Sequence, residues 1–187
     1  MAKKTIFTKP KEILIAPWTE DEDGELIAPT SASVIELGSV IADSLTITQE
    51  DPETTDIDCE TSDEPVYSVT TAGKYTVELN NASIDDEYLE KVMGWEKDGT
   101  NFVAPKSYAA RYISIQVAFT ENSKFLYLPK VLIAPKLVFE SLSTNIAYGT
   151  LSGTASSSKI GTAANAKEGP IATLATAILT KAAKANL

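Results

Sequence analysis

Alternation of hydrophobic and polar residues recurs along the chain and predicts short β-strands. In residues 44–48, two hydrophobic side chains alternate with serine and threonine, which is the period of a half-buried strand. The same period appears in residues 74–79 and, as one long strand, in residues 111–120. Residues 11–18 add a short apolar strand that Pro17 ends. The pattern indicates a chain that is mainly β.

Two interruptions frame an acidic strand. The segment Gln49–Glu53 breaks the alternation through Pro52, and Ser62–Pro65 is predicted to turn the chain again. Between them, Ile57 and Cys59 alternate with three acids that share one face: Asp56, Asp58 and Glu60. Because burial of three unpaired carboxylates is prohibitively costly, we expect that face to lie in water.

One helix is predicted over residues 83–94. Ser83 is placed to cap it, Asp85–Glu87 puts negative charge in its first turn, and Gly94 supplies the stop. Its apolar residues form one stripe at helical spacing: Ile84, Tyr88, Leu89, Val92 and Met93. Because so short a helix needs support, we expect it to pack on a sheet with Trp95 as an anchor.

The later segments are again β in character. Residues 124–141 are nearly continuous apolar residues, interrupted by Pro129 and Pro135, which predicts a bend or a sheet edge there. Glycines within the predicted strand of residues 147–158 indicate a bulge or the close approach of another backbone. Residues 171–175 are compatible with a strand or with the start of a helix, and we expect partial order that depends on a contact between subunits.

These elements predict one globular domain in a chain of 187 residues. Residues 1–12 are predicted to be a flexible N-terminal arm or an edge strand completed by a neighbour, 13–158 the β domain, and 159–187 a C-terminal extension. The expected fold class is a mainly β sandwich or barrel with one flanking α-helix. Such a fold leaves strand edges exposed, and a ring of identical subunits joined sheet to sheet would cover them.

Charge is unevenly distributed along the chain. The region from Glu12 to Gly73 holds 16 of the 26 acids and none of the 16 bases, so its net charge is −16 and that of the remainder is +6. Because carboxylates repel phosphate, this region is not a groove that grips DNA. Two interpretations stay open: an acidic surface that keeps the protein soluble, or opposite charges that meet when identical subunits pack head to tail.

The residues present exclude several kinds of catalysis. The chain has no histidine, which excludes Ser/His/Asp and Cys/His nucleophiles and histidine-bearing zinc sites. Its single cysteine, Cys59, is best interpreted as a small apolar filler and fits a reducing compartment. The acidic loop Thr19–Gly24 lacks most ligands of a calcium loop. We therefore expect no enzyme, cofactor or metal site, and a soluble protein without a secretion signal or membrane span.

Two stretches carry a resemblance to a known family. LGSVIADSLTITQEDPETTDIDCETSDEPV (37–66) and GKYTVELNNASIDDEYLEKVMGW (73–95) resemble the tail tube (major tail) proteins of bacteriophages. LPKVLIAPKLVFESLSTNIAYGTLSGTAS (128–156) is similar to the closing strands of that family. The likeness covers residues 30–155 and contains no invariant catalytic motif.

The resemblance implies a structural role. Family members have a fold related to type VI secretion tube proteins, and they form hexameric rings that stack into a hollow tube through which the phage genome passes. The protein would then be assembled in the cytoplasm of a bacterial host and reside in the virion tail, with further copies, other tail proteins and passing DNA as its partners. Prophage origin fits the same implication.

A carboxylate-lined lumen would give passing DNA no place to adhere, although salt screens the repulsion beyond about 8 Å. Six acids are the candidate lumen-facing or inter-ring positions: Glu50, Asp51, Glu53, Asp56, Asp58 and Glu60. The family uses a long loop to contact the next ring, for which Thr19–Gly24 and Asp63–Val66 are both candidates.

Two other classes of function remain. A virion decoration or host-surface-binding β-domain would be a monomer or trimer with an exposed aromatic groove, for which Tyr108, Tyr112 and Tyr127 are candidates. A hydrolase based on carboxylates would rely on pairs such as Asp51 with Glu53 or Asp85 with Asp86, but turns and a helix start explain those acids locally.

Overall fold

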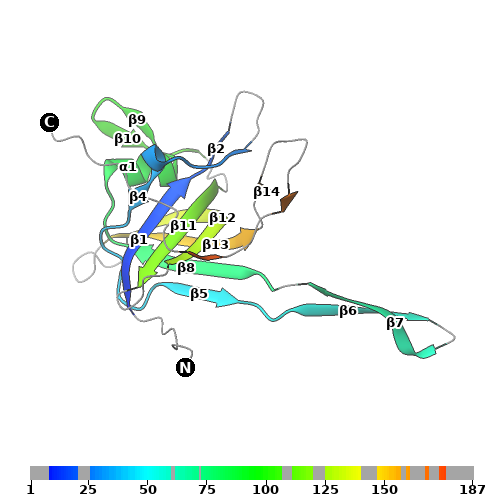
Figure 1. Ribbon diagram of the computed structural model, residues 1–187. Helices are drawn as coiled ribbons and strands as arrows, with labels where there is room; N and C mark the ends of the chain where they lie inside the picture. Colours follow the sequence, from blue (N-terminus) through cyan, green and yellow to red (C-terminus); the bar gives the residue numbers. More distant parts are fainter. Residues whose placement is uncertain are drawn as a thin grey trace.

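The computed structural model of the chain is mainly β, with one short helical segment, as the sequence predicts (Figure 1). It describes residues 9–20, 26–59, 62–71, 73–106, 111–119, 125–139, 147–156, 159–160, 167–168 and 173–175. The body is an eight-stranded antiparallel sheet in the order β4-β1-β11-β12-β13-β8-β5, with β16 beside β12. Its strands are β1 (Pro10–Pro17), β4 (Ile35–Glu36), β5 (Thr46–Gln49), β8 (Tyr75–Asn81), β11 (Arg111–Phe119), β12 (Phe125–Val138), β13 (Tyr148–Ser156) and β16 (Thr173–Ala175).

Four two-stranded ribbons accompany this sheet. They pair β2 (Thr19–Glu20) with β3 (Leu26–Ile27), β6 (Glu53–Cys59) with β7 (Ser62–Thr71), β9 (Glu96–Asp98) with β10 (Asn101–Val103), and β14 (Lys159–Ile160) with β15 (Lys167–Glu168). A 3-10 turn covers Ser31–Ser33, and the helical segment comprises α1 (Asp86–Tyr88) and a π turn, η2 (Leu89–Met93).

The segment 35–41 joins the two ends of the curled sheet. The Leu37 amide donates to the Ile13 carbonyl of β1 at 2.9 Å. A few residues later, the Ile41 amide donates to the Asn80 carbonyl at 2.9 Å and Val40 forms a bridge with Asn81. One short segment therefore bonds to β1 and to β8, which closes the sheet into a barrel at this end.

One hydrophobic core fills the inside of the barrel. Inward side chains of β1, β8, β11, β12 and β13 pack together with Tyr88, Val92 and Met93 of the helical segment. Trp95 packs against this cluster, which confirms its predicted role as an anchor. Gly94 adopts a left-handed conformation with φ 71° and ends the helix, as predicted.

The predicted start of the helix was wrong by two to three residues. Asp85, not Ser83, is the N-cap, and its carboxylate accepts a hydrogen bond from the Tyr88 amide at 2.8 Å. Ser83 is held instead by Asn81, whose side-chain amide donates to the Ser83 carbonyl at 2.6 Å and accepts from its N–H at 3.3 Å. Because Asn81 engages the backbone of Ser83, the helix begins only after the next two residues.

Pro129 and Pro135 were expected to lie at a bend or a sheet edge, and β12 continues through both of them, with Pro129 at a bulge and Pro135 where β12 is an edge on the β11 side. The register shifts between Ile113 and Ile115, so Pro129 lies at a bulge, and its carbonyl accepts hydrogen bonds from the side chains of Trp18 and Ser114 at 3.1 and 2.6 Å. Pro135 pairs with β13 but lies past Ile133, the last β12 residue that β11 pairs. Each proline therefore occupies a position where its missing N–H costs no ladder bond.

Three further boundaries differ from the sequence prediction. The last residues of the predicted N-terminal arm belong to the sheet, since β1 begins at Pro10. Ser62–Pro65 does not turn the chain but belongs to β7, where a register shift opposite the end of β6 accommodates the proline. In the tail, residues 173–175 form a strand that pairs with β12 of the same chain, so this part is ordered without a second subunit.

Tyr88 gives the first testable prediction. Its side chain is 1% exposed, its hydroxyl has no hydrogen-bond partner among the described residues, and burial raises the pKa of the phenol above its ordinary value. Above pH 10 the unfolded chain loses this proton while the folded protein keeps it, so the free energy of unfolding falls by about 1.4 kcal/mol per pH unit. Tyr88→Phe should remove this slope without loss of stability at pH 8. Urea titrations from pH 8 to 11 measure it; a pH-independent difference between the two proteins would contradict the assignment.

Candidate assembly surfaces

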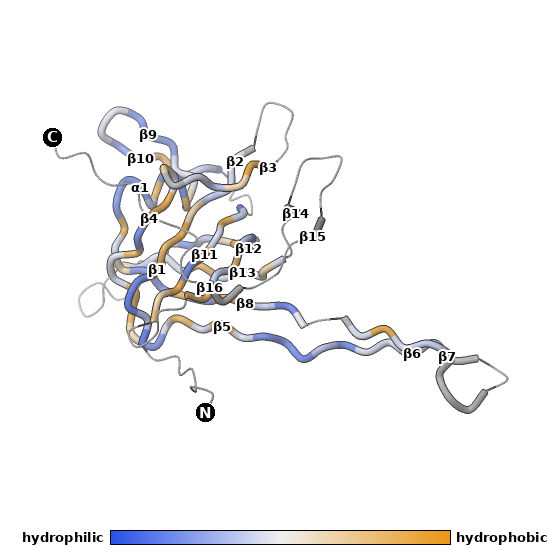
Figure 2. The backbone as a smooth tube through the Cα atoms, in the orientation of Figure 1, coloured by the Kyte–Doolittle hydropathy of each residue, from blue (hydrophilic) through white to orange (hydrophobic). Residues whose placement is uncertain are grey.

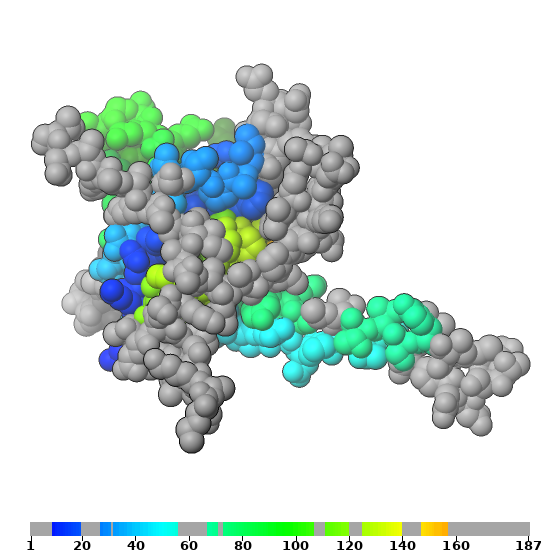
Figure 3. Space-filling view, viewed as in Figure 1, coloured from blue at the N-terminus to red at the C-terminus, as the bar shows by residue number. Residues whose placement is uncertain are grey.

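A two-stranded arm is the feature that most distinguishes this protein from a closed barrel. It consists of β6 and β7, which continue β5 and β8 beyond the body (Figure 1). Figure 3 shows the same segment standing clear of the rest of the molecule. A two-stranded ribbon is only marginally stable in water by itself, so an arm of this length is expected to be completed by another surface.

One face of the arm is apolar although it is exposed. Tyr67 and Val69 are two residues apart on β7 and so share a face, with side chains 63% and 42% exposed. Thr55 of β6 lies opposite Val69. Figure 2 shows a hydrophobic stretch on this otherwise polar ribbon. On the other face, the hydroxyls of Thr54 and Thr70 are 3.1 Å apart across the strands. The arm therefore has an apolar side suited to protein contact and a polar side suited to water.

A short connector joins the arm to the body. Residues 50–52 leave the ladder between β5 and β6, while the Glu50 amide still donates to the Lys74 carbonyl at 2.9 Å. Gly73 is buried against this connector, and a Cβ placed on it would overlap the Glu50 carbonyl oxygen. A glycine is thus required at position 73, where two segments of the chain lie close together at the base of the arm.

The structure places three of the six predicted acidic positions. Glu50, Asp51 and Glu53 are all exposed, at the connector and at the first residue of β6. Asp56 and Asp58 are residues of β6, of which the structure describes the backbone but not these two side chains. Glu60 lies outside the described residues. The described acids therefore gather where the arm leaves the body, and whether they face a lumen or another ring stays a prediction.

The outer side of the sheet carries a second surface, which we call the hydroxyl face. It covers four neighbouring strands, β5, β8, β13 and β12, opposite the hydrophobic core. Its residues are half-buried or exposed and mostly end in hydroxyl or methyl groups: Thr46, Thr48, Thr76, Glu78, Thr150, Ser152, Thr154, Leu132, Ala134 and Lys136.

Strand register aligns these residues in rows across the sheet. One row runs from Thr48 through Thr76 and Thr154 to Leu132. The next runs from Thr46 through Glu78 and Ser152 to Ala134. Lys130, which pairs with Ser156, lies on the same side of β12 as Leu132 and Lys136, so the four strands carry two ammonium groups and one carboxylate, Glu78, on this side. The rest of the face is an array of short side chains.

The opposite side of the body has a different chemistry. The helical segment and the β9–β10 ribbon expose charges of both signs, including an ion pair between Lys91 and Glu87 at 2.7 Å and one between Lys97 and Asp86 at 3.4 Å. Interspersed charges of this kind are typical of surfaces that face bulk water. The two sides of the sheet are therefore chemically distinct.

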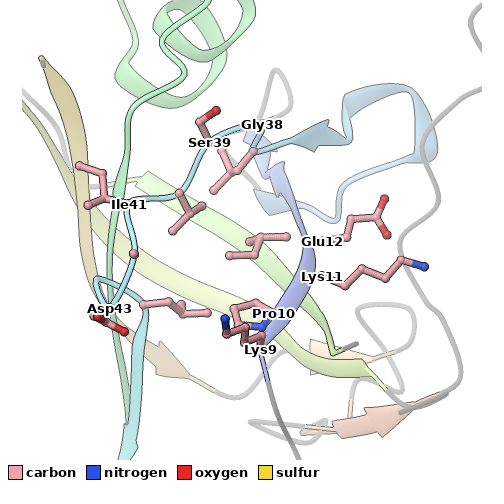
Figure 4. A pocket seen from close by; sticks show the side chains of 13 residues that line it. Lys9, Pro10, Lys11, Glu12, Gly38, Ser39, Ile41 and Asp43 are labelled. Carbon is pink, nitrogen blue, oxygen red and sulfur yellow. The ribbon is translucent and has the colours of Figure 1, made fainter. Parts of the chain in front are cut away.

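A cavity of about 580 Å³ lies between the start of β1 and residues 37–45 (Figure 4). Ile13, Val40 and Leu45 line it with apolar surface. Polar and charged residues line it as well, among them Lys9, Ser39 and Asp43 (Figure 4).

Two of the three tyrosines named as candidates for the aromatic groove of a host-binding domain make contacts within the chain. Lys130 stacks its ammonium 4.4 Å from the ring centre of Tyr112 and 5.3 Å from that of Trp18, so the Tyr112 ring is already in contact with a side chain of the same chain. Tyr127 packs against a small second cluster formed by Leu14, Ala16 and Val34. Tyr108 lies outside the described residues.

Sequence reasoning missed the hydroxyl face and the extent of the arm. Alternating polar residues in 46–48, 76–80 and 150–156, mostly threonine and serine, were a usable signal for the face, because alternation puts them on one side of their strands. That these strands are neighbours follows only from the topology. Among the described residues, the structure contains no cluster of three potential metal ligands and no helix long and apolar enough to span a membrane.

The sequence gives no match to the protein-family models or to the curated proteins with which it was compared.

Proposed function

We propose that the protein is the structural subunit of a bacteriophage tail tube, which assembles into stacked rings around a channel for DNA, with other tail proteins as further partners. The sequence resemblance supplies the family. A mainly β barrel with one flanking helix is the fold that this resemblance implies. The subunit would be made in the host cytoplasm and reside in the virion.

The observation that carries the proposal is the arm with its exposed apolar face. Tyr67 and Val69 present hydrophobic surface on a projecting ribbon that has no core of its own. Exposed apolar groups on a projecting ribbon favour a partner that covers them. A repeating assembly supplies such a partner, because each subunit receives the arm of another.

Unprotected strand edges support the same proposal. Among the described residues no strand pairs with the outer edge of β5, and residues 12–73 contain no lysine or arginine to block an edge. The acidic arm and connector of one subunit and the basic remainder of another have opposite charges, which favours head-to-tail contact. The six acidic positions named above remain our candidates for the lumen or the inter-ring contact.

Electron microscopy of the purified protein tests this function. We expect rings or tubes when the protein concentration is raised or a tail-tip initiator complex is added. Sedimentation at low and high salt should show that assembly weakens as salt screens the opposite charges. A protein that stays monomeric at every concentration, with and without the initiator, would contradict the proposal.

A host-surface-binding domain is the alternative. It predicts a stable monomer or trimer that is retained on glycan or cell-surface arrays. The contacts of Tyr112 and Tyr127 within the chain do not favour it.

A further inference from the structure

We propose that the cavity between the start of β1 and residues 37–45 is the docking site of the N-terminal segment of the same chain, residues 1–8. The adjacent apolar side chains of Ile6 and Phe7 fill it and extend the hydrophobic core to this end of the barrel. The contact lies within one subunit, so it does not depend on the proposed function.

The floor of the cavity is continuous with the hydrophobic core. Ile13 and Leu37 are buried core residues that also line the cavity. Val40 and Leu45 line it as well, and they are only partly buried against the same core. Because contact between apolar surface and water is unfavourable, an apolar group that fills the cavity stabilises the folded chain.

The walls of the cavity are fixed by hydrogen bonds. On one side, the Leu37 amide donates to the Ile13 carbonyl at 2.9 Å. On the other, the Ile41 amide donates to the Asn80 carbonyl at 2.9 Å, and the Ser44 hydroxyl donates to the Ile41 carbonyl at 2.7 Å. Walls held in this way do not collapse onto each other, and protein interiors leave few voids of this size unfilled.

The N-terminal segment begins at the rim of this cavity. Lys9 and Pro10, the first described residues, line its lower end in Figure 4, and Gly38 and Ser39 line its upper end. A chain advances at most about 3.6 Å per residue, so the Cα atom of Phe7 lies within about 7 Å of that of Lys9. A connection this short reaches the cavity at little cost in loop entropy.

The composition of the segment matches that of the cavity. Ile6 and Phe7 stand between Thr5 and Thr8, so an apolar pair has a polar residue on each side. The rim of the cavity is polar and carries charges of both signs, from Lys9, Lys11, Glu12 and Asp43. The apolar pair therefore fits the floor, and the threonines fit the rim, where they stay in contact with water.

Methyl NMR spectra of the unassembled subunit test the contact. The ring of Phe7 should shift the signals of the Val40 and Leu45 methyl groups, and Phe7→Leu should abolish that shift because it keeps an apolar side chain but removes the ring. The Val103 methyl groups, on the exposed β9–β10 ribbon, are the control and should not move. Identical Val40 and Leu45 signals in the two proteins would overturn the inference.

A mixed sample identifies the chain that fills the cavity. Isotope-labelled Phe7→Leu protein is mixed with an excess of unlabelled, unsubstituted protein, so only a second copy can supply the ring. For a contact within one chain, the labelled Val40 and Leu45 signals should stay at their positions in Phe7→Leu alone. Their return to the positions of the unsubstituted protein would assign the cavity to a second copy and refute a contact within the chain.

Thermal unfolding of the unassembled subunit gives a second readout. Ile6→Ser combined with Phe7→Ser removes both apolar side chains from the cavity and should lower the melting temperature by about 4–8 °C. Thr5→Ser combined with Thr8→Ser changes the same segment and should shift it by no more than about 2 °C. Equal melting temperatures of the two double variants would show that the cavity is not filled by this segment.

Discussion

Replacement of Tyr67 and Val69 by asparagine should abolish tube assembly while the subunit remains folded. Both side chains are exposed on the arm, which has no part in the core, so their loss leaves the body intact. Burial of each against a partner would contribute about 1.5–3 kcal/mol, so each substitution should raise the threshold concentration for assembly by about tenfold or more. Sedimentation and electron microscopy measure the threshold, and circular dichroism measures the fold.

The opposite face of the same strand provides the control. Ser68→Asn and Thr70→Asn place two amides on β7 at neighbouring positions that point to the polar side. These changes match the first pair in strand, number and lack of charge, and they should leave the threshold within a factor of about three. Equal loss of assembly in both variants would show that the arm acts only through its backbone.

Gly149→Ala should destabilise the folded subunit by about 1–3 kcal/mol because it overpacks the core. A Cβ on Gly149 would lie 2.5 Å from the hydroxyl oxygen of Tyr88 and 2.9 Å from the nearest ring carbon. Tyr88 is fully buried, so its ring has no open space into which it can move. Urea denaturation at neutral pH measures the loss.

The hydroxyl oxygen is the closest of the contacted atoms, so its removal should relieve part of the strain. We expect Tyr88→Phe to recover about 0.5–2 kcal/mol in the Gly149→Ala background, beyond its effect in the unsubstituted protein. Gly38→Ala is the control, because its Cβ would meet only the flexible Ser83 hydroxyl at 3.2 Å and should cost less than about 0.5 kcal/mol. Additive effects of the two core substitutions would mean that the backbone, not Tyr88, absorbs the added methyl group.

Local patterns predicted the strands well because each strand has one buried side. Val77 and Leu79 are buried while Glu78 is exposed, as the alternation in β8 predicts. Leu45 and Ile47 likewise pack on the core while Thr46 and Thr48 are exposed. The glycines in residues 147–158 were expected to mark a bulge or the close approach of another backbone, and Gly153 does so, because a Cβ on it would overlap the Leu132 carbonyl oxygen. At Gly149 the close neighbour is the ring of Tyr88 instead.

Tertiary contacts decided the features that local patterns left open or predicted wrongly. Pro129 is accepted in a central strand because side chains of Trp18 and Ser114, distant in sequence, satisfy its carbonyl. Asp85 rather than Ser83 caps the helix, because the Asn81 side chain is hydrogen-bonded to the backbone of Ser83. The hydroxyl face could not be predicted at all, since its rows exist only once β5, β8, β13 and β12 are neighbours.

Closure of the barrel by residues 35–41 also determines when the chain can fold during its synthesis. The first half of the protein supplies β1, yet β1 pairs with β11, whose residues leave the ribosome about 100 positions later. Segments that wait so long for their partners are exposed to misfolding and self-association. The excess of 16 negative charges in residues 12–73 makes waiting nascent chains repel one another, so the same carboxylates protect the polypeptide before any tube exists.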